Sequence, residues 1–248
     1  MANPYILSMM SARKVVVDIE TIPCADENRR LLGRPRPLAE ASLWSRLFRS
    51  RQENAAAEQE LYLQTSLNWT FGRIICVCLL IEAESQPSQT RAFLARIDPA
   101  DTLDTSLSKE AATLKEFWDA VLPDDYFIGH NILGFDLPFL WNRSLVCNVR
   151  PSRPLQLDRE SVRFTFDTMQ VWGHWSGSYG GRQHASLNNL SQVMGLPGKT
   201  GAGSQVYDLW RRQRFEEIRD YCMRDVTLEY DLYRRLTLAG NAPTLHWS

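Results

Sequence analysis

The sequence predicts an α/β fold, because strand-like and helix-like segments alternate along its 248 residues. Residues 14–19 form an apolar, β-branched run that predicts a central strand. Residues 106–122 place apolar side chains at the spacing of an amphipathic helix. The length suits one large domain, which buries enough surface to need no metal or disulfide staples. We therefore expect residues 1–248 to form a single α/β domain.

The same two periodicities predict the other elements in chain order. Pro138 falls in the first turn of one helix, where a proline is tolerated. Gly195 and Pro197 end the next predicted helix, because both residues disfavour its continuation. We expect strands at 73–82, 90–95 and 126–129, a helix at 137–143, a strand passing into a helix over 163–172, and helices at 186–194 and 214–238.

Residues 23–68 separate the first two predicted strands. Connections of this length usually carry a function or are mobile, and an alanine- and charge-rich piece at 39–63 predicts a helix. We therefore expect a helical insertion at about 24–68. Basic and aromatic residues interleave in it, as on a surface that binds single strands. The same composition suits a helix packed on the domain, or a contact in a homodimer. These residues are Trp44, Arg46, Phe48, Arg49 and Arg51.

Composition and charge exclude several classes of protein. Hydrophobic residues make up 44% of the chain and charged residues 23%, which excludes a mainly disordered chain and a coiled coil. The net charge of −1 argues against a protein that coats nucleic acid without specificity. No long window is uninterruptedly apolar, and no basic residue precedes the short apolar N-terminal stretch. We therefore expect neither a membrane span nor a secretory signal.

The five cysteines are scattered and include no CxxC pair, so their spacing predicts no zinc site. Cys76 and Cys78 lie two residues apart on a predicted strand and point to the same face of it. We expect these two to be reduced core residues of a cytoplasmic protein.

Two acids, Asp18 and Glu20, end the first predicted strand. Period-two alternation puts both on one face, about 7 Å apart along the strand. Two carboxylates at this distance repel each other unless a cation lies between them. Open α/β sheets bind ligands at the carboxyl ends of their strands. Taken alone, the segment fits a ligand site and a pair of solvated acids beyond a finished strand equally well.

A second polar turn follows the strand predicted at 126–129 and ends at Asp136. On its own, Asp136 fits the N-cap of the following helix better than a catalytic acid. His130 fits an ordinary hydrogen-bonded histidine, and Asn131 fits a turn residue.

The third segment lies on the long helix predicted at 214–238. Tyr221 and Asp225 are four residues apart and share one helix face. Because an unpaired buried charge is costly, a core-facing Asp225 needs a partner, either an arginine or a metal ion. The same side of the helix continues toward the core with Leu228, Leu232 and Leu236.

Together the three segments supply four carboxylates, from a strand end, a helix start and a helix interior. Oxygen ligands of this kind suit Mg²⁺ or Mn²⁺. Two such ions about 4 Å apart can activate a water and stabilise the leaving oxygen in phosphodiester cleavage. A tyrosine one turn from the last acid is placed to orient that water. The four acids are Asp18, Glu20, Asp136 and Asp225.

These segments resemble the three motifs of the DEDD superfamily of 3′–5′ exonucleases, which are DnaQ-like proteins with a ribonuclease H-like fold. The chain is most similar to the predicted exonucleases related to the proofreading domain of family-B DNA polymerases. A tyrosine at the start of the third motif indicates the tyrosine subclass, since the other subclass has histidine there. The resemblance covers roughly residues 13–238 and implies a central mixed β-sheet flanked by α-helices. The motifs are Asp18-Ile19-Glu20, Asn131-Ile132-Leu133-Gly134-Phe135-Asp136 and Tyr221-Cys222-Met223-Arg224-Asp225.

The resemblance also implies a role for each motif residue at the metal site. Asp18, Glu20 and Asp225 would hold the metal ion that carries the attacking water, and Asp18 would also reach a second ion. Asp136 would act largely through metal-bound waters. Tyr221 would hydrogen-bond the attacking water.

Four further residues would contact the substrate. Thr21 and Ile22, just after the first motif, would contact or wedge the terminal nucleotide. Asn131 and Phe135 would line the path of the last bases, with Phe135 stacking on a base.

The implied activity is hydrolysis of phosphodiester bonds from the 3′ end of single-stranded nucleic acid, with DNA favoured over RNA. The products would be nucleoside 5′-monophosphates, and two Mg²⁺ or Mn²⁺ ions would be the cofactors. A catalytically silent nucleic-acid-binding module on the same fold is one alternative. Another polynucleotidyl enzyme, such as an endonuclease, is a second. The presence of all four acids favours an exonuclease over the first, and the pairing of Tyr221 with Asp225 argues against the second.

Several residues outside the motifs have two interpretations. Asp167 follows a predicted strand, and we expect it to be structural rather than a metal ligand. Three loop residues fit a grip on the phosphate backbone, and fit solvated loop charges slightly better. Two tryptophans fit base stacking, and the first of them fits a buried position at least as well. The loop residues are Arg182, His184 and Lys199, and the tryptophans are Trp172 and Trp175.

Overall fold

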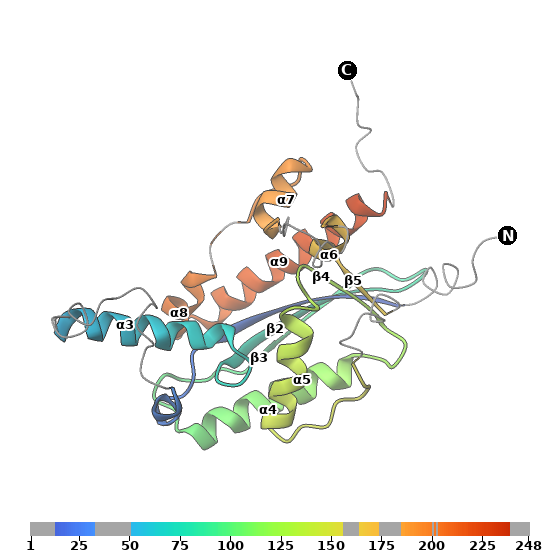
Figure 1. Ribbon diagram of the computed structural model, residues 1–248. Helices are drawn as coiled ribbons and strands as arrows, with labels where there is room; N and C mark the ends of the chain where they lie inside the picture. The colour runs from blue at the N-terminus through green and yellow to red at the C-terminus, as the bar shows by residue number, and fades with distance from the viewer. Residues whose placement is uncertain are drawn as a thin grey trace.

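The computed structural model describes residues 13–32, 51–155, 164–173, 185–199, 201 and 203–238. Its strands form one five-stranded sheet in the order β3-β2-β1-β4-β5 (Figure 1). The apolar N-terminal strand β1 is central, as predicted. The strands are β1 (Lys14–Ile22), β2 (Arg73–Glu82), β3 (Gln89–Leu94), β4 (Tyr126–Gly129) and β5 (Thr165–Asp167).

The sheet is mixed. β1 is antiparallel to β2 and parallel to β4, β2 is antiparallel to β3, and β4 is parallel to β5. In the β1–β2 register, Asp18 lies opposite Cys78 and Glu20 lies opposite Cys76. The register then shifts between Glu20 and Thr21, so a bulge follows the two acids. A bulge bends the strand and redirects the side chains next to it.

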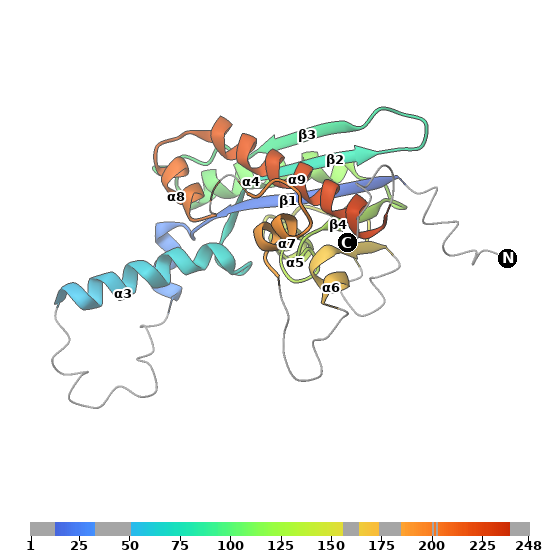
Figure 2. The same ribbon diagram turned by 90° about the horizontal axis from the view of Figure 1, so that it is seen from above.

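Helices cover both faces of the sheet (Figures 1 and 2). On one face lie α4 (Leu103–Ala120) and α5 (Asp136–Val146). On the other face the long α9 (Phe215–Leu236) crosses β1 and β2, with α8 (Ser204–Arg211) beside it. The short α6 (Thr168–Trp172) and α7 (Leu187–Val193) contact α9. The α/β class predicted from the sequence, with a mixed sheet flanked by helices, is confirmed.

The segment between β1 and β2 contains the helix α3 (Arg51–Gln64), with the 3-10 turns η1 (Asp26–Leu31) before it and η2 (Thr65–Leu67) after it. In Figure 2, α3 projects past the end of the sheet. The helical character expected of the insertion is therefore seen in its second half. The interleaved residues from Trp44 to Arg49 lie outside the described residues.

The core has two halves, one on each face of β1. Val15, Val17 and Ile19 pack toward α4 and α5, while Val16 packs toward α9. This explains the uninterrupted apolar run, because a central strand that is covered on both faces needs apolar side chains on both. By the same alternation, Asp18 and Glu20 face α9.

Buried polar contacts connect α4, α5 and β2. The Arg143 guanidinium donates to both Glu110 oxygens, at 2.8 and 2.7 Å. The backbone N–H of Ile74 donates to Glu110 Oε1 at 2.9 Å, and Trp118 Nε1 donates to Ser144 Oγ at 2.8 Å. These contacts satisfy the buried side chains of Glu110 and Arg143 and the indole N–H of Trp118.

The structure extends the predicted elements in two places. β1 continues to Ile22, so its acids lie within the strand rather than after it. The helix α8 was not expected, because its eight residues follow a glycine-rich loop and are fewer than the window over which a helical periodicity is read. Among the helices that the structure describes, none has the length and apolar character that a membrane span needs.

Candidate functional site

Four acids come together around β1 from three elements distant in sequence. Asp18 and Glu20 come from β1, Asp136 is the first residue of α5, and Asp225 lies in the middle of α9. Asp136 is 4% exposed and Asp225 is 2% exposed, while Asp18 is partly exposed. Acids this buried need a compensating positive charge or protonation.

Asp18 and Glu20 are not solvated acids beyond a finished strand, and that interpretation is wrong. β1 continues past both residues to Ile22, and Glu20 is 9% exposed. Ligand atoms from Asp18, Glu20 and Cys222 all lie within 4.8 Å of one another. The expected placement of both acids on one face of the strand explains this proximity.

Asp136 does not act as an N-cap, so the interpretation favoured for it alone is also wrong. Phe135 occupies the cap position and its side chain caps nothing. Asp136 Oδ1 instead accepts a hydrogen bond from the backbone N–H of Ile19, at 3.2 Å. This bond ties the start of α5 to β1, between the two acids of that strand.

Asp225 is paired with a lysine rather than with the arginine that we considered. Lys199 Nζ lies 2.7 Å from Asp225 Oδ2. The backbone N–H of Lys199 donates to Asn188 Oδ1 at 3.0 Å, so α7 helps to hold the loop that carries the lysine. The interpretation of Lys199 as a solvated loop charge is therefore wrong, since the residue points into the site.

Tyr221 shares the buried face of α9 with Asp225, as predicted, and is 4% exposed. Its hydroxyl is buried and has no hydrogen-bond partner among the described residues. Lys199 Nζ lies 5.6 Å from the centre of the Tyr221 ring. Burial, and then the charge of Asp225, raise the pKa of Tyr221, so its hydroxyl stays protonated and can donate.

Burial and mutual repulsion raise the pKa values of the acids. Burial, followed by the charge of Asp225, raises the pKa of Asp18 to about 8. Burial and the charge of Asp18 hold the pKa values of Glu20 and Asp136 well above the usual range. Asp18 Oδ2 is buried and has no partner within the described part of the chain. A divalent cation fits this donor set, because it would neutralise the charge and satisfy the unpaired oxygens.

A fifth buried acid, Glu229, was missed by the sequence analysis. It lies four residues after Asp225 on α9 and is 2% exposed. Glu229 Oε1 accepts a hydrogen bond from the backbone N–H of His130 at 3.2 Å, and Oε2 has no described partner. Burial and the charge of Asp18 raise its pKa well above the usual range. The signal that could have found it is the spacing of four from Asp225.

His130 is an ordinary hydrogen-bonded histidine, as we expected. Its Nε2 lies 3.0 Å from the carbonyl oxygen of Ala185, and its Nδ1 lies 2.9 Å from Thr168 Oγ1. The carbonyl can only accept, so Nε2 carries the proton, and Nδ1 shares the Thr168 hydroxyl proton with the carbonyl oxygen of Gly129, which lies 3.2 Å from Thr168 Oγ1. Burial lowers the pKa of His130 to about 4, so the ring is neutral.

The expected substrate-contacting residues differ in accessibility. Thr21 is partly exposed, and its hydroxyl donates to the carbonyl oxygen of Ser66 at 2.6 Å. Ile22 is fully buried in the α9 half of the core. Asn131 adopts a φ of 60°, a conformation that asparagine tolerates, and is partly exposed. Phe135 is also partly exposed and packs on Phe139, with ring centres 5.2 Å apart.

Asp167 is structural, as we expected. Its side chain accepts hydrogen bonds from the backbone N–H groups of Asn131, Leu133, Met169 and Gln170. It therefore caps α6 and holds the turn that leads to Asp136. Trp172 is half-exposed at the end of α6, and the site residues considered at 175, 182 and 184 lie outside the described residues.

Two hollows flank the acids. One of about 440 Å³ is lined by Lys199, Asp225 and neighbouring residues of α9. The other, of about 520 Å³, lies beyond the register shift that follows Glu20, between Thr21, η2 and α8. A larger hollow of about 960 Å³ lies on the α4–α5 side, and none of the four acids lines it.

The sheet order and the helices on both faces are consistent with the ribonuclease H-like exonuclease fold, so fold and site define an exonuclease-type α/β protein. A family model described as "Predicted 3'-5' exonuclease related to the exonuclease domain of PolB" matches residues 64–244. The chain belongs to this family, and its enzyme class is that of a 3′–5′ exonuclease. The matched range includes Asp136, Tyr221 and Asp225, and begins after β1. None of the curated proteins compared with the chain matches it.

Proposed function

We propose that the protein is a metal-dependent 3′–5′ exonuclease of the tyrosine subclass of the DEDD superfamily. It removes nucleoside 5′-monophosphates from the 3′ end of single-stranded nucleic acid, with DNA favoured over RNA. The observation that carries the proposal is the set of unpaired buried oxygens of Asp18 and Tyr221 beside Glu20. A site with excess negative charge and an unused hydroxyl supports cation-dependent hydrolysis better than a structural role.

Asp18, Glu20 and Asp225 would hold one Mg²⁺ or Mn²⁺ ion, and Asp18 would reach a second. Asp136 would act largely through metal-bound waters. When bound, such ions activate a water and stabilise the leaving oxygen of the phosphodiester. Asp136 keeps its orientation through the N–H of Ile19. Asp167 accepts hydrogen bonds from the backbone of Asn131 and Leu133, and so holds the turn that leads to Asp136.

Tyr221 would orient the attacking water, because its protonated hydroxyl has no other described partner. Lys199 would leave Asp225 when cations bind and would contact the scissile phosphate, since it lies on a loop beside a hollow. A mobile cation of this kind stabilises charge that develops on the phosphate oxygens.

Thr21, Asn131 and Phe135 keep the substrate roles expected of them, because each retains exposed surface. Ile22 has no exposed surface, so its part is to support Thr21 from the core rather than to contact the nucleotide. The hollow beyond the register shift after Glu20 is the proposed place of the terminal nucleotide.

The test is incubation of the purified protein with 5′-labelled single-stranded DNA and the matched RNA, in Mg²⁺, Mn²⁺ or EDTA. We expect a ladder that shortens from the 3′ end, disappears in EDTA, and is lost in Asp18→Asn and Asp225→Asn. A circular single strand should remain intact. Cleavage retained by both variants would overturn the assignment of the site.

The Lys199–Asp225 ion pair favours a second candidate, a catalytically silent binding module, because a lysine already neutralises one of the acids. Strand binding without any cleavage in either metal would support this candidate instead.

We also propose a cytoplasmic location. All five cysteines are free, and all five are described. Free thiols are usual in a reducing compartment.

A further inference from the structure

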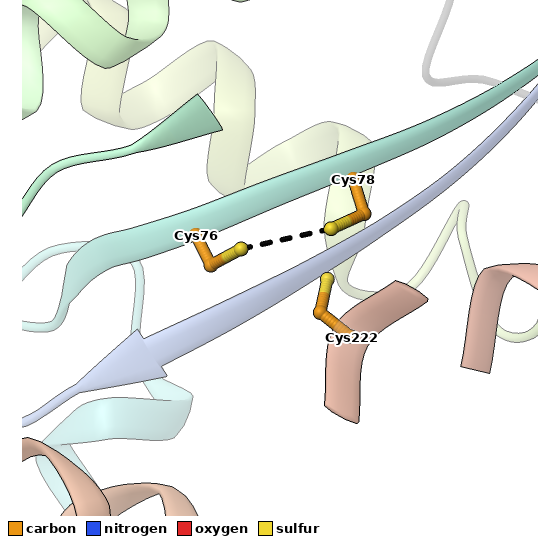
Figure 3. A group of neighbouring side chains, drawn as sticks. All are labelled: Cys76, Cys78 and Cys222. Atoms are coloured by element: carbon orange, nitrogen blue, oxygen red, sulfur yellow. Dashed lines mark hydrogen bonds between the residues drawn. The ribbon is translucent and has the colours of Figure 1, made fainter. Parts of the chain in front are cut away.

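Three cysteines from two elements distant in sequence meet beside Asp18 and Glu20. Cys76 and Cys78 lie on β2, and Cys222 lies on α9 next to Tyr221 (Figure 3). All three are fully buried. The spacing of two on a strand points Cys76 and Cys78 to the same face, which α9 covers. The third thiol faces them from the helix, so the fold makes a cluster that the sequence spacing does not show.

The sulfur positions suit a tetrahedral metal site. The Sγ atoms of Cys76 and Cys78 are 3.7 Å apart. All three Sγ atoms lie within 4.8 Å of one another. With zinc–sulfur bonds of about 2.3 Å, tetrahedral geometry puts two sulfurs about 3.8 Å apart. Small side-chain adjustments would therefore bring all three thiols to ligand distance of one ion.

The thiols adjoin the carboxylates directly. Cys78 lies opposite Asp18 and Cys76 opposite Glu20 in the sheet, and such pairs point to the same face. The sulfur of Cys222 and one carboxylate oxygen each of Asp18 and Glu20 also lie within 4.8 Å of one another. A carboxylate oxygen is thus available as a fourth ligand, and the partly exposed Asp18 leaves a path for a cation from that side.

We propose that Cys76, Cys78 and Cys222 form a binding site for one thiophilic cation of the zinc class, with a carboxylate oxygen of Glu20 as the fourth ligand. Thiolates select zinc-class ions, whereas the carboxylates alone suit Mg²⁺ and Mn²⁺. Binding replaces the S–H bonds of the thiols with metal–sulfur bonds, and releases the thiol protons and the carboxyl proton of Glu20 to solvent.

Occupation of this thiol site has a consequence that rests on the proposed function. It withdraws Glu20 from the oxygen-ligand site, so a zinc-class ion inhibits cleavage even when Mn²⁺ is in excess. Binding itself does not depend on the exonuclease activity, so the two can be tested separately.

Binding is tested by adding Co²⁺, as a spectroscopic substitute for zinc, to the reduced full-length protein in excess Mn²⁺. We expect one Co²⁺ per chain, with sulfur-to-cobalt charge-transfer bands and visible bands of tetrahedral cobalt. Zn²⁺ should abolish these bands, and proton release should accompany its binding. Cys76→Ser, Cys78→Ser and Cys222→Ser should each lose the charge-transfer intensity. Cys147→Ser is the matched control, because Cys147 lies outside the cluster, and it should keep the bands.

A wild-type protein without sulfur-to-cobalt bands would overturn the proposal. Because a buried serine can destabilise the fold, X-ray absorption of the zinc-loaded wild-type protein gives an answer that needs no variant. Three sulfurs and one oxygen around zinc are expected, and a shell of oxygen and nitrogen alone would contradict the site.

Inhibition is tested by adding Zn²⁺ to the exonuclease assay in Mn²⁺. Cys76→Ala should keep the activity in Mn²⁺ and should need at least about tenfold more Zn²⁺ for half-inhibition. Equal sensitivity of Cys76→Ala and wild type would overturn the inhibitory role. If the protein cleaves nothing, the cobalt spectra still decide whether the thiol site exists.

Discussion

Asp18 links the electrostatics of the site to the stability of the fold. Its pKa is raised to about 8 by burial and then by Asp225, whereas an aspartate in an unfolded chain titrates near about 3.9. The folded protein therefore keeps a proton that the unfolded chain has lost. The stability that this proton contributes is present below the unfolded value and is lost as the pH rises through about 8.

We therefore expect the metal-free protein to lose on the order of 1 kcal/mol of unfolding free energy between about pH 7 and pH 8.5. The raised pKa values of Glu20, Asp136 and Glu229 act in the same direction. His130, whose pKa is lowered, affects stability only at lower pH. Urea unfolding in EDTA at several pH values measures the effect. Asp18→Asn should reduce the change of the unfolding free energy with pH. An unfolding free energy of the wild type that does not change between these pH values would contradict the raised pKa of Asp18.

The hydroxyl of Tyr221 is buried without a described partner, so its removal should cost the fold little. We expect Tyr221→Phe to keep the melting temperature, and to lower the cleavage rate roughly a hundredfold, as for the loss of a group that positions a reacting water. Tyr126→Phe is the control, because Tyr126 begins β4 away from the acids. Equal cleavage rates of the wild type and Tyr221→Phe would show that the Tyr221 hydroxyl has no part in the reaction.

Lys199 competes with cations for Asp225 in the metal-free protein. We expect Lys199→Met to bind Mn²⁺ roughly fivefold more tightly, a change of about 1 kcal/mol, and to cleave more slowly. Titration of free Mn²⁺ by electron paramagnetic resonance measures the first effect, and rates at saturating Mn²⁺ measure the second. Lys109→Met, which breaks an ion pair with Asp101 on the other face of the sheet, should change neither. Weaker Mn²⁺ binding in Lys199→Met would show that the lysine supports the metal site rather than competing with it.

Among the elements, α4 and α5 depend on one buried ion pair. Glu110 accepts from Arg143 and from the N–H of Ile74, so the removal of either partner leaves a buried group unpaired. We expect Arg143→Met to lower the free energy of unfolding by about 3–5 kcal/mol. Urea denaturation measures it. The exposed pair of Lys115 with Asp119 is the comparison, and Lys115→Met should cost less than about 0.5 kcal/mol. Similar costs for both variants would contradict the importance of burial.

The long elements could be predicted from sequence, whereas the contacts of the site could not. β1 and β2 have long apolar runs, α4 and α9 have apolar side chains at helical spacing, and all four elements are present in the fold. α8 was missed because it spans only eight residues, fewer than the window over which a helical periodicity is read, although Val206 and Trp210 share its buried face.

Three features of the site depend on tertiary placement. The pairing of Lys199 with Asp225 brings a loop onto a helix. The bond between Asp136 and the N–H of Ile19 joins a helix start to the central strand. The meeting of Cys222 with the strand thiols joins α9 to β2. No local pattern encodes any of these contacts, since each joins segments far apart in sequence.

On the scale of the whole molecule, a cation at the acids would join β1, α5 and α9. We expect Mn²⁺ at about a hundred times its dissociation constant to stabilise the fold by about 2.7 kcal/mol. Hydrogen exchange should slow together in all three elements, and Asp225→Asn should reduce the effect in all three. Slower exchange in only one of them would show that the ion does not bridge the elements. The single-domain organisation and a homodimer stay predictions.

The two ends of the segment between β1 and β2 lie side by side and are joined by hydrogen bonds. Thr21 donates to the carbonyl of Ser66, the N–H of Cys24 donates to Thr65 Oγ1 at 2.9 Å, and Arg73 Nε donates to the carbonyl of Pro23 at 2.9 Å. These bonds hold the two ends of the connecting segment together whatever the length of chain between them. Doubling a closed loop costs only about 0.6 kcal/mol of chain entropy. The connecting segment is therefore where the chain can accept added sequence, such as an inserted tag or a whole guest domain, without moving Asp18 and Glu20.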